Sequence, residues 1–565
     1  MTNNIDYDKL RGGYYTPKPI ADFLVNWAVC TSDSTILEPS SGDGVFVESS
    51  VERLRYLGSN GNDLTRQLYP VELDPVEAAK IQERLKCLNI EAEELVRNED
   101  FFTIARDHLV DNISFDCVVG NPPFIRYQNF VEEYRSIAFE LMKNFGLNPN
   151  RLTNIWVPFL VLSSKLLAHG GRLAMVIPAE LFQVNYAGET RRFLSEYFSR
   201  INIVTFRKLV FPDIQQEVIL LLAEKNGGGA TTISTIEVDD TESLLSVDLD
   251  NNPNIEAKEM MHTNDKWTYY FLNRNDIEFL QNIKDNYTYD LTGQHIDVDV
   301  GVVTGQNKFF VLKNSDVKYF GLKHYIQRII TRTTHLAGIS FDENKWESND
   351  CKDYPMYLFL PPDKEYSELT KCVKEYIDSG EAEKIHNGYK CRIRKRWYIV
   401  PSVWTPHAFM LRQVHKYPRI VLNHVNATCT DTIHRVRFIS DLNPQHITAG
   451  FLNSLTFAFS ELTGRSYGGG VMTFEPTECE RLPFPTNGIE RLDFEHIAQL
   501  LEIENIDAVL DITDQVLLVD GLGMPENDVV RLRNIWKSLR DRRIERKQSN
   551  RNAYKTTHEY QLPIV

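Results

Sequence analysis

The chain has 565 residues, of which 42% are hydrophobic and 25% charged, a composition typical of a folded globular protein rather than a disordered one. This length exceeds one ordinary domain, so we expect two or three. The formal net charge of −16 argues against a uniformly basic nucleic-acid-binding protein, because phosphate contacts need Lys and Arg. Basic residues nevertheless gather between Lys390 and Arg396 and between Arg531 and Arg551, so a local basic surface is compatible with this total.

Cysteine spacing and hydropathy indicate in which cellular compartment the protein is expected. No stretch is long and apolar enough to span a bilayer, and the start MTNNIDYDKLRGG lacks the pattern of a signal peptide. The 8 cysteines are scattered without a CxxC pair, and the 14 histidines match no metal-ligand spacing. We therefore expect a cytoplasmic protein with no membrane anchor and no metal.

From residue 17 to about 222, helical and strand-like segments alternate. The apolar spacing predicts helices over 20–29, 76–88 and 155–167, and strands over 34–39, 66–73, 115–123 and 172–178. A turn is expected at Gly170-Gly171. Two more strands, 203–211 and 217–225, are expected to lie close together. This alternation predicts an α/β fold with a mostly parallel sheet covered on both faces.

The pattern changes after Asn226, where NGGGATT predicts a turn and the acidic segment 239–254 a linker. Aromatic and basic residues then rise between Gly301 and Phe484, with short strands and many turns. Residues 491–549 are predicted to be helical, with interruptions at Gly521, Gly523 and Pro525. We expect three regions: an α/β domain over 1–240, a mixed α+β domain over 255–490, and a helical region over 491–565.

Three polar motifs follow strands of the predicted sheet, where ligands bind in open α/β folds. The first, Leu37–Gly44, combines glycines that allow close backbone approach with acidic side chains. The second, Val71–Asp74, supplies an acid where such folds bind a ribose diol. The third, Glu99–Phe102, supplies an acid and an aromatic ring suited to adenine. Each motif alone is an ordinary loop pattern, and none is the GxGxxG of a dinucleotide site. Together they predict a nucleoside-bearing cofactor without a diphosphate.

The most specific motif is Asn121-Pro122-Pro123-Phe124, at the end of the strand expected over 115–123. Prolines at this position also simply end strands. An amide, two prolines and an aromatic ring in succession suit the activation of a planar amine, because the Asn121 side-chain oxygen and the Pro122 carbonyl can accept its two hydrogens. Phe124 can stack on a base. Positioning and preorganised dipoles would then supply much of the rate, without a metal.

These residues resemble the gamma-class (TaqI-like) DNA adenine-N6 methyltransferases of restriction–modification systems. The resemblance rests on Asn121–Phe124, on the loop 38–44 and on Tyr15-Thr16-Pro17. It implies a Rossmann-like methyltransferase domain, a following target-recognition domain and S-adenosylmethionine as cofactor. It also implies that the cofactor pocket is lined by Thr16, Glu38, Ser40, Gly42, Glu72, Asp100, Phe101 and Asn121.

The same resemblance assigns roles at the target base. Asn121, Pro122, Pro123 and Phe124 would be the catalytic residues, and Phe124 and Phe211 would pack on a base rotated out of the duplex. A lone Phe beside a strand is more often part of the core. Phe124 stands where Tyr is commoner in the family, and stacking should be preserved.

The second half offers candidates for DNA contacts. Arg394 and Arg396 lie in a segment that mixes cations with aromatic rings, as nucleic-acid surfaces do. Arg465 and Tyr467 flank a Gly-rich loop that resembles recognition-domain segments of the family. A basic loop packed against its own domain explains each residue equally well.

Other functions fit parts of the sequence. Asn-Pro-Pro-Phe also serves in methyltransferases acting on protein glutamine or ribosomal RNA, and a catalytically idle DNA-binding specificity protein would keep the fold. The chain length and the Thr-Pro motif favour double-stranded DNA. Outside the methyltransferase half we find no convincing cluster of carboxylates for a fused nuclease, so we expect any cognate restriction endonuclease to be separate. We expect a monomer, because both halves lie on one chain. The recognition sequence cannot be read from the order of residues.

Overall fold

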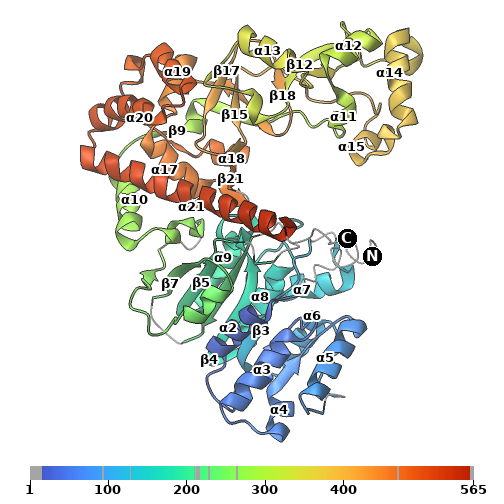
Figure 1. The fold of residues 1–565 in the computed structure, drawn as a ribbon, viewed down its shortest axis with the longest axis vertical. Helices are drawn as coiled ribbons and strands as arrows, with labels where there is room; N and C mark the ends of the chain where they lie inside the picture. Colours follow the sequence, from blue (N-terminus) through green and yellow to red (C-terminus); the bar gives the residue numbers. More distant parts are fainter. Residues whose placement is uncertain are drawn as a thin grey trace. The chain divides into compact units, whose positions relative to one another are not determined.

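The computed structural model describes residues 15–91, 94–126, 129–208, 210–211, 217–226, 230–261, 265–467 and 470–559 (Figure 1). The chain divides into two compact units. The first comprises Met1–Phe279 with Tyr467–Gly469 and Glu545–Val565, and the second comprises Leu280–Ser466 and Gly470–Ile544. The domain boundaries expected from the sequence stay a prediction.

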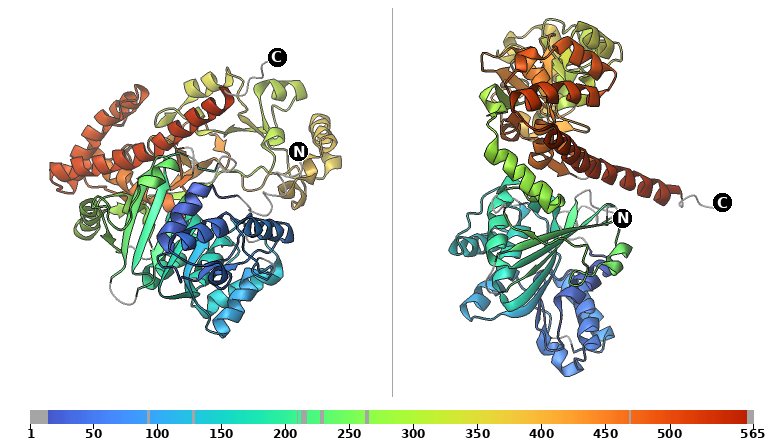
Figure 2. Two further views of the ribbon diagram at one scale, coloured as in Figure 1. Left: turned by 60° about the horizontal axis from the view of Figure 1, so that its bottom comes forward. Right: turned by 90° about the vertical axis from the view of Figure 1, so that its left-hand side faces the viewer.

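A large sheet forms the centre of the first unit (Figure 2). Strand β6 runs antiparallel to β4 and β5, and β8 runs antiparallel to β7, whereas the other neighbouring strands are parallel. The α/β fold class is therefore confirmed, as is the pairing of the strands expected at 203–211 and 217–225. In spatial order the strands are β2 (Leu68–Pro70), β1 (Ile36–Glu38), β3 (Phe115–Gly120), β4 (Leu167–Pro178), β6 (Val218–Glu224), β5 (Arg200–Phe206), β7 (Thr232–Val238) and β8 (Lys258–Glu259).

Helices cover both faces of this sheet, because side chains alternate along each strand. Along β4, Ala174 and Val176 join the core that contains α2, whereas Leu173 and Met175 are buried on the opposite face. In one layer α3 contacts α2 and α5, and α2 and α3 contact the sheet, whereas α6 to α9 pack together in another layer. The bounds are α2 (Lys18–Ala28), α3 (Val45–Tyr56), α4 (Gly61–Gln67), α5 (Pro75–Cys87), α6 (Phe101–Val110), α7 (Glu132–Asn144), α8 (Trp156–Lys165), α9 (Gly188–Tyr197) and α10 (Arg274–Asn286).

Two local predictions in this unit are wrong. The expected turn at Gly170-Gly171 lies inside β4. Its backbone pairs with Lys225, through Gly170 N to Lys225 O at 2.7 Å and Lys225 N to Gly171 O at 2.9 Å, while the neighbouring β3–β4 register shifts. The segment 239–254 is also no free linker, because Leu244 and Leu249 are buried in the core. Most of the glycine run expected as a turn lies outside the described residues.

The second unit contains several smaller sheets. One has the order β10-β19-β15-β17-β13, and another has the order β11-β14-β12-β18. Their mixed pairing confirms the expected α+β character. The strands are β9 (Asp290–Leu291), β10 (Ile296–Val300), β11 (Val311–Leu312), β12 (Ile326–Ile330), β13 (Ser340–Phe341), β14 (Tyr357–Phe359), β15 (Ala408–Leu411), β16 (Gln413–Val414), β17 (Ile420–Asn423), β18 (Thr428–Cys429), β19 (Ile433–Phe438), β20 (Arg465–Tyr467), β21 (Val471–Thr473) and β22 (Pro483–Phe484).

Helices of this unit include the C-terminal region up to Ile544, and the predicted helical character of that region is confirmed. A π-helix, Gln515–Gly521, lies where glycines were expected to interrupt the region, and α21 begins after Pro525. In the described chain, no helix is both long and apolar enough to cross a membrane. The bounds are α11 (Asn307–Phe310), α12 (Asn314–Phe320), α13 (Glu343–Asp350), α14 (Lys371–Ala382), α15 (Tyr389–Arg392), α16 (Pro444–Gly450), α17 (Ser454–Thr463), α18 (Pro476–Cys479), α19 (Phe494–Glu502), α20 (Ile506–Asp514) and α21 (Glu526–Glu559).

Candidate active site

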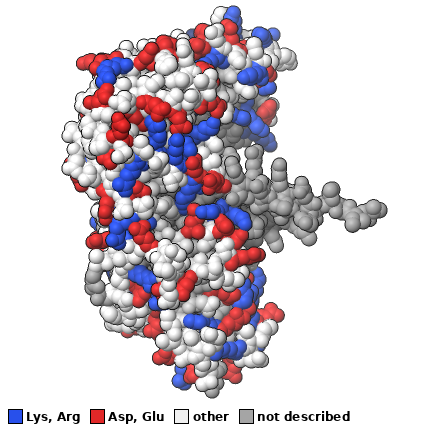
Figure 3. Space-filling view, turned by 60° about the vertical axis from the view of Figure 1, so that its left-hand side comes forward, with Lys and Arg blue, Asp and Glu red and all other residues white. Residues whose placement is uncertain are grey.

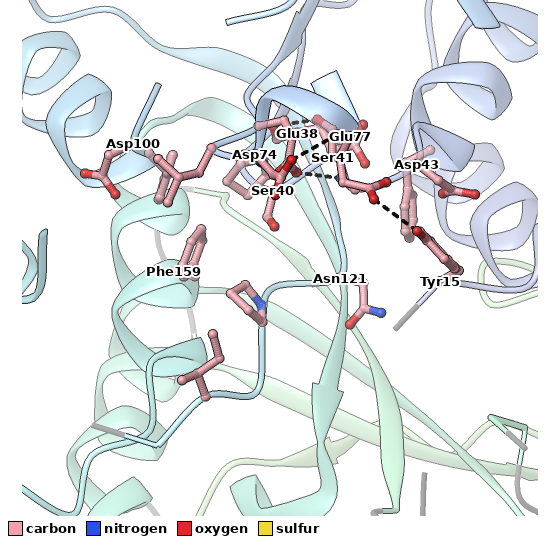
Figure 4. A pocket seen from close by; sticks show the side chains of 18 of the residues that line it. Tyr15, Glu38, Ser40, Ser41, Asp43, Asp74, Glu77, Asp100, Asn121 and Phe159 are labelled. Carbon is pink, nitrogen blue, oxygen red and sulfur yellow. Dashed lines mark hydrogen bonds between the residues drawn. The ribbon is translucent and has the colours of Figure 1, made fainter. Parts of the chain in front are cut away.

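A cavity of about 400 Å³ opens at the carboxyl ends of β1, β2 and β3 (Figure 4). The chain passes from β1 to β2 on one side and later to β3 on the other, so the cavity lies at a switch point of the sheet, where α/β folds bind ligands. All eight residues expected in the cofactor pocket line it: Thr16, Glu38, Ser40, Gly42, Glu72, Asp100, Phe101 and Asn121.

The loop after β1 is held close to the cavity by two glycines with positive φ. Gly42 has φ +52° and Gly44, which precedes α3, has φ +83°, a region that side chains other than glycine rarely adopt. A Cβ at Gly44 would also lie 3.1 Å from Ile81 Cγ1 of α5. These glycines therefore allow the loop 38–44 to turn tightly above the sheet.

Glu72 joins this loop to the next one. Its carboxylate accepts hydrogen bonds from Gly42 N at 2.8 Å and from Asp74 N at 2.9 Å. Asp74 in turn caps α5, accepting from Val76 N at 2.7 Å. The Glu72 side chain therefore stabilises the cavity wall as well as presenting an acid to it.

Glu38 is a buried acid at the end of β1. Its side chain is 3% exposed, and neither carboxylate oxygen has a hydrogen-bond partner among the described residues. Burial raises the pKa of Glu38 well above its ordinary value; the nearby Ser41 hydroxyl opposes this shift, and the Asp43 and Glu72 carboxylates add to it. A buried acceptor without a partner is costly, so this carboxyl group is suited to a ligand that brings a cation or a hydrogen-bond donor.

Asp100 and an aromatic pair form the opposite wall (Figure 4). Asp100 caps α6 by accepting from Thr103 N at 2.9 Å, and its burial raises its pKa. The rings of Phe101 and Phe159 stack with centroids 5.1 Å apart and planes 15° from parallel. An acid beside stacked rings can bind a flat heterocycle that carries an amino group.

Asn121 lies at the rim of the cavity, directly after Gly120. Gly120 has φ +154°, and a Cβ there would contact Pro39 and Glu38 at 3.5–3.6 Å. The Asn121 side-chain nitrogen donates to Thr16 Oγ1 at 3.1 Å. This bond orients the amide, so its oxygen faces away from Thr16.

The remaining candidates for the target base are not all on the cavity wall. Pro123 lines the cavity, but Pro122 and Phe124 do not. Phe124 is half-buried and packs against the core cluster to which Phe211 belongs. Phe211 itself is 5% exposed, so it contributes to the core. A role for Phe124 and Phe211 at a base stays a prediction.

Sequence comparison connects both halves of the chain with one class of enzymes. The family "Eco57I restriction-modification methylase" matches residues 51–211, which include Glu72, Asp100 and Asn121 but neither Thr16 nor Glu38. The family "Type II methyltransferase M.Eco57I, C-terminal domain" matches residues 264–518.

Individual relatives extend the similarity over most of the chain. The type II methyltransferase M.AccI of Acinetobacter calcoaceticus is 22% identical over 493 residues, covering 85% of this chain and 86% of the relative. M.XamI of Xanthomonas campestris pv. amaranthicola is 22% identical over 494 residues, with 84% and 85% covered. M.HindII of Haemophilus influenzae is 24% identical over 370 residues, with 62% and 65% covered. These matches support a restriction–modification methyltransferase.

Solved structures agree at the level of the fold. The type IIL restriction-modification enzyme MmeI, solved in complex with DNA, aligns with a TM-score of 0.57 at 11% identity, over 93% of this chain and 75% of that chain. At this identity the comparison shows the shared fold alone.

The arginines expected to contact DNA are engaged within the protein. Arg394 donates to the backbone oxygens of Val303 and Thr304, and Arg396 forms ion pairs with Asp363 and Glu365. Arg465 pairs with Glu478 at 3.0 Å. The side chain of Tyr467 lies outside the described residues. The role of these three arginines in DNA binding stays a prediction.

Several cavity residues were missed by the sequence analysis. Asp43, which pairs with Arg84 at 3.2 Å, belongs to the motif 38–44, from which only Glu38, Ser40 and Gly42 were predicted to line the pocket. Tyr15 donates to Glu77 Oε1 at 3.1 Å at the edge of the cavity (Figure 4). Phe159 lies on the buried helix α8, in a continuous apolar run that offers no local signal.

In the described chain no group of three or more His, Cys, Asp or Glu could hold a metal.

Proposed function

We propose that this protein is a DNA methyltransferase that transfers the methyl group of S-adenosylmethionine to the exocyclic N6 of adenine. The observation that carries the proposal is the meeting of Glu38, Glu72 and Asp100 with Asn121 around one cavity. The first three suit a nucleoside cofactor, and the fourth suits an amine. The similarity to type II methyltransferases supports the same conclusion.

The cavity fits the chemical groups of this cofactor. Its amino-acid part carries an ammonium, which matches the buried and unpaired carboxyl group of Glu38. Its ribose hydroxyls match Glu72, and its adenine ring matches Asp100 beside the stacked rings of Phe101 and Phe159. When bound, the cofactor supplies an electrophilic methyl group on a sulfonium.

The residues at the rim would prepare the acceptor amine. The lone pair of the adenine amino nitrogen is delocalised into the ring, so the nitrogen is a weak nucleophile. The Asn121 side-chain oxygen and the Pro122 carbonyl would accept its two hydrogens and favour tetrahedral geometry. Preorganised acceptors of this kind act without a strong base. Phe124 would stack on the flipped base and offset part of the lost base stacking.

The proposal extends to partners. Double-stranded DNA would be the substrate, methylation would protect it from a restriction endonuclease on a separate chain, and the enzyme would act as a cytoplasmic monomer. RNA or protein glutamine as acceptor, or an idle specificity protein, are outcomes that the following experiment separates.

Transfer of labelled methyl from S-adenosylmethionine to unmethylated genomic DNA tests the proposal, with nucleoside analysis and single-molecule sequencing of the product. Label in N6-methyladenine at one short sequence is the expected result. Label in cytosine, ribosomal RNA or protein would overturn the substrate assignment while keeping the cofactor. No transfer to any acceptor, despite cofactor binding, would overturn the activity.

A further inference from the structure

The second unit carries a basic surface that differs from the one expected from the sequence. We infer that duplex DNA is contacted by Lys308, Lys390, Arg392 and Lys395, whereas Arg394 and Arg396 hold this surface in place. We call residues 303–308 and 388–395 the basic loop surface. The inference deepens the proposed function, on which its choice of partner rests.

Two segments far apart in the sequence build this surface. Arg394 Nη2 donates to Val303 O at 3.1 Å and to Thr304 O at 2.8 Å, which ties the segment after α15 to the loop before α11. Gly305 has φ +83°, and a Cβ there would lie 2.7 Å from Lys390 Cβ. The absence of a side chain at Gly305 therefore lets the two segments pack closely.

Arg394 and Arg396 are occupied by their own unit. The Arg394 guanidinium also lies over the Phe310 ring, 5.5 Å from its centroid. Arg396 is bound by Asp363 at 2.6 Å and by Glu365, and its side chain is 15% exposed. A phosphate would have to displace these partners. The two arginines are therefore positioning residues.

The neighbouring cations are exposed instead. Lys308, Lys390, Arg392 and Lys395 are all exposed, and none forms an ion pair with any residue that the structure describes. Many other cations of the unit are neutralised by an acid, for example Lys313 by Asp353 at 2.9 Å. Four unneutralised cations within two joined segments attract a polyanion despite the net charge of −16. On the face drawn in Figure 3, basic and acidic side chains are likewise interspersed, so the total charge does not describe each surface.

Apolar side chains accompany these cations. Val303 is 40% exposed, Tyr389 66% and Ile393 59%, and all three belong to the basic loop surface. Lysines and arginines would contact phosphates, while exposed aromatic and aliphatic groups would pack on sugars and base edges. This combination fits DNA better than a small anion, which needs no apolar contact.

The test is the salt dependence of binding to a duplex, measured by fluorescence anisotropy with full-length protein between 50 and 300 mM salt. The variant carries Lys390→Gln, Arg392→Gln and Lys395→Gln. Each lost phosphate contact should lower the slope of log affinity against log salt by about 1, hence by about 3 in total. Affinity at the lowest salt should fall at least about 10-fold. Cofactor affinity should not change, because the cavity of the first unit contains none of the three residues.

A matched control removes the same charge elsewhere in this unit, through Lys318→Gln, Lys323→Gln and Lys352→Gln. These lysines are exposed and lie outside the basic loop surface. The control should keep most of the salt slope. An unchanged slope in the first variant, or an equal loss in the control, would overturn the inference.

A further variant, Tyr389→Ala, separates the apolar contact from the charges. It should weaken duplex binding several-fold while leaving the salt slope unchanged, and unchanged affinity would remove the apolar side chains from the inference.

These experiments separate failure of the proposed function from failure of the inferred DNA-binding surface. If only the proposed function were wrong, the wild-type protein would transfer no methyl group to DNA, but its duplex binding would still depend on Lys390, Arg392 and Lys395. If the protein methylated DNA but its duplex binding did not depend on these three residues, only the inferred surface would be wrong.

Discussion

At the scale of single residues, Glu38 combines burial with an acidic side chain. A carboxylate prefers water, and nothing among the described residues satisfies its two oxygens. The motif after β1 indicated an acid that would meet an amine or a hydroxyl. Gly120 of the neighbouring strand lies close to it, because a Cβ there would be 3.6 Å from Glu38 Cγ, and the motif does not reveal this contact.

Glu38→Gln should change the pH dependence of stability. Since the folded pKa of Glu38 is raised, its stabilising contribution as a neutral acid is fully present below the unfolded pKa near 4.5, and is lost as pH rises through the folded pKa. The glutamine side chain of the variant does not ionise, so the variant does not lose stability in this way. The difference between its unfolding free energy and that of the wild type should therefore shift in favour of the variant from pH 5 to pH 8. Each tenfold change in the acid dissociation constant between the folded and unfolded states corresponds to about 1.4 kcal/mol. Urea unfolding without cofactor measures the difference.

The same variant should bind S-adenosylmethionine about 10- to 100-fold more weakly, because a charge-assisted hydrogen bond is worth about 1.5–3 kcal/mol. Calorimetric titration measures this loss. A variant that binds as tightly as the wild type, with no gain in stability at pH 8, would contradict the assignment of Glu38.

Asn121→Ala should separate chemistry from cofactor binding. Loss of one preorganised hydrogen-bonding group lowers turnover by about 100- to 1000-fold, whereas the dissociation constant of the cofactor should stay within a few-fold. Rates of methyl transfer to DNA and calorimetric titration provide the two measurements. Asn129→Ala, on the same cavity wall, is the matched control and should retain turnover. Normal transfer by the Asn121 variant would refute its catalytic role.

At the scale of elements, local signals predicted several helices and strands well. Pro525, which was expected to interrupt the helical region, precedes α21; Asp493 and Asn505, which the sequence analysis did not single out, cap α19 and α20 by accepting hydrogen bonds from backbone N–H groups. Such signals act between neighbouring residues and are visible in the sequence. The prediction of a turn at Gly170-Gly171 was wrong because their backbone pairs with Lys225, directly after β6, and that pairing joins residues more than 50 positions apart.

A buried ion pair connects α17 with α21. Arg543 Nη2 donates to Glu461 Oε1 at 2.7 Å and Nη1 donates to Gly470 O at 2.7 Å, and both charged side chains are buried. Burial raises the pKa of Glu461, and the arginine opposes this shift. The pair therefore depends on both partners.

Arg543→Leu should lower the free energy of unfolding of the second unit by about 3–5 kcal/mol, because it leaves an unpaired buried acid. Adding Glu461→Leu should recover much of the loss, since an apolar pair removes the isolated charge. Urea denaturation followed by tryptophan fluorescence provides the measurement, with the double variant as control. If the single variant were as stable as the wild type, the pair would not hold these helices together.

At the scale of the whole molecule, the two compact units each have their own sheets and core. Stability of the chain is therefore not expected to follow one two-state transition. The cavity with Glu38 and Asp100 belongs to the first unit, whereas the basic loop surface belongs to the second. S-adenosylmethionine should therefore stabilise the first unit, and duplex DNA should stabilise the second.

Differential scanning calorimetry should resolve this difference. S-adenosylmethionine at 100 times its dissociation constant should stabilise the transition of the first unit by about 2.7 kcal/mol. The cofactor should leave the midpoint temperature of the second unit's transition unchanged, whereas duplex DNA should raise that temperature. Glu38→Gln, which weakens cofactor binding, is the control and should reduce the first shift. Equal shifts of all transitions by the cofactor alone would contradict the separation.

The sequence by itself determined the α/β order and the polar ends of β1, β2 and β3, because strand periodicity and the residues after a strand are local properties. The motif Asn121–Phe124 was recognised for the same reason, whereas the set of eight residues that line the cavity followed from the family resemblance that these motifs carry. Only the tertiary structure decided that Phe159 stacks on Phe101, that Leu244 joins the core, and that Arg394 and Arg396 bind their own unit. These facts depend on contacts between distant segments, and the sequence of one segment does not specify which distant segment it contacts.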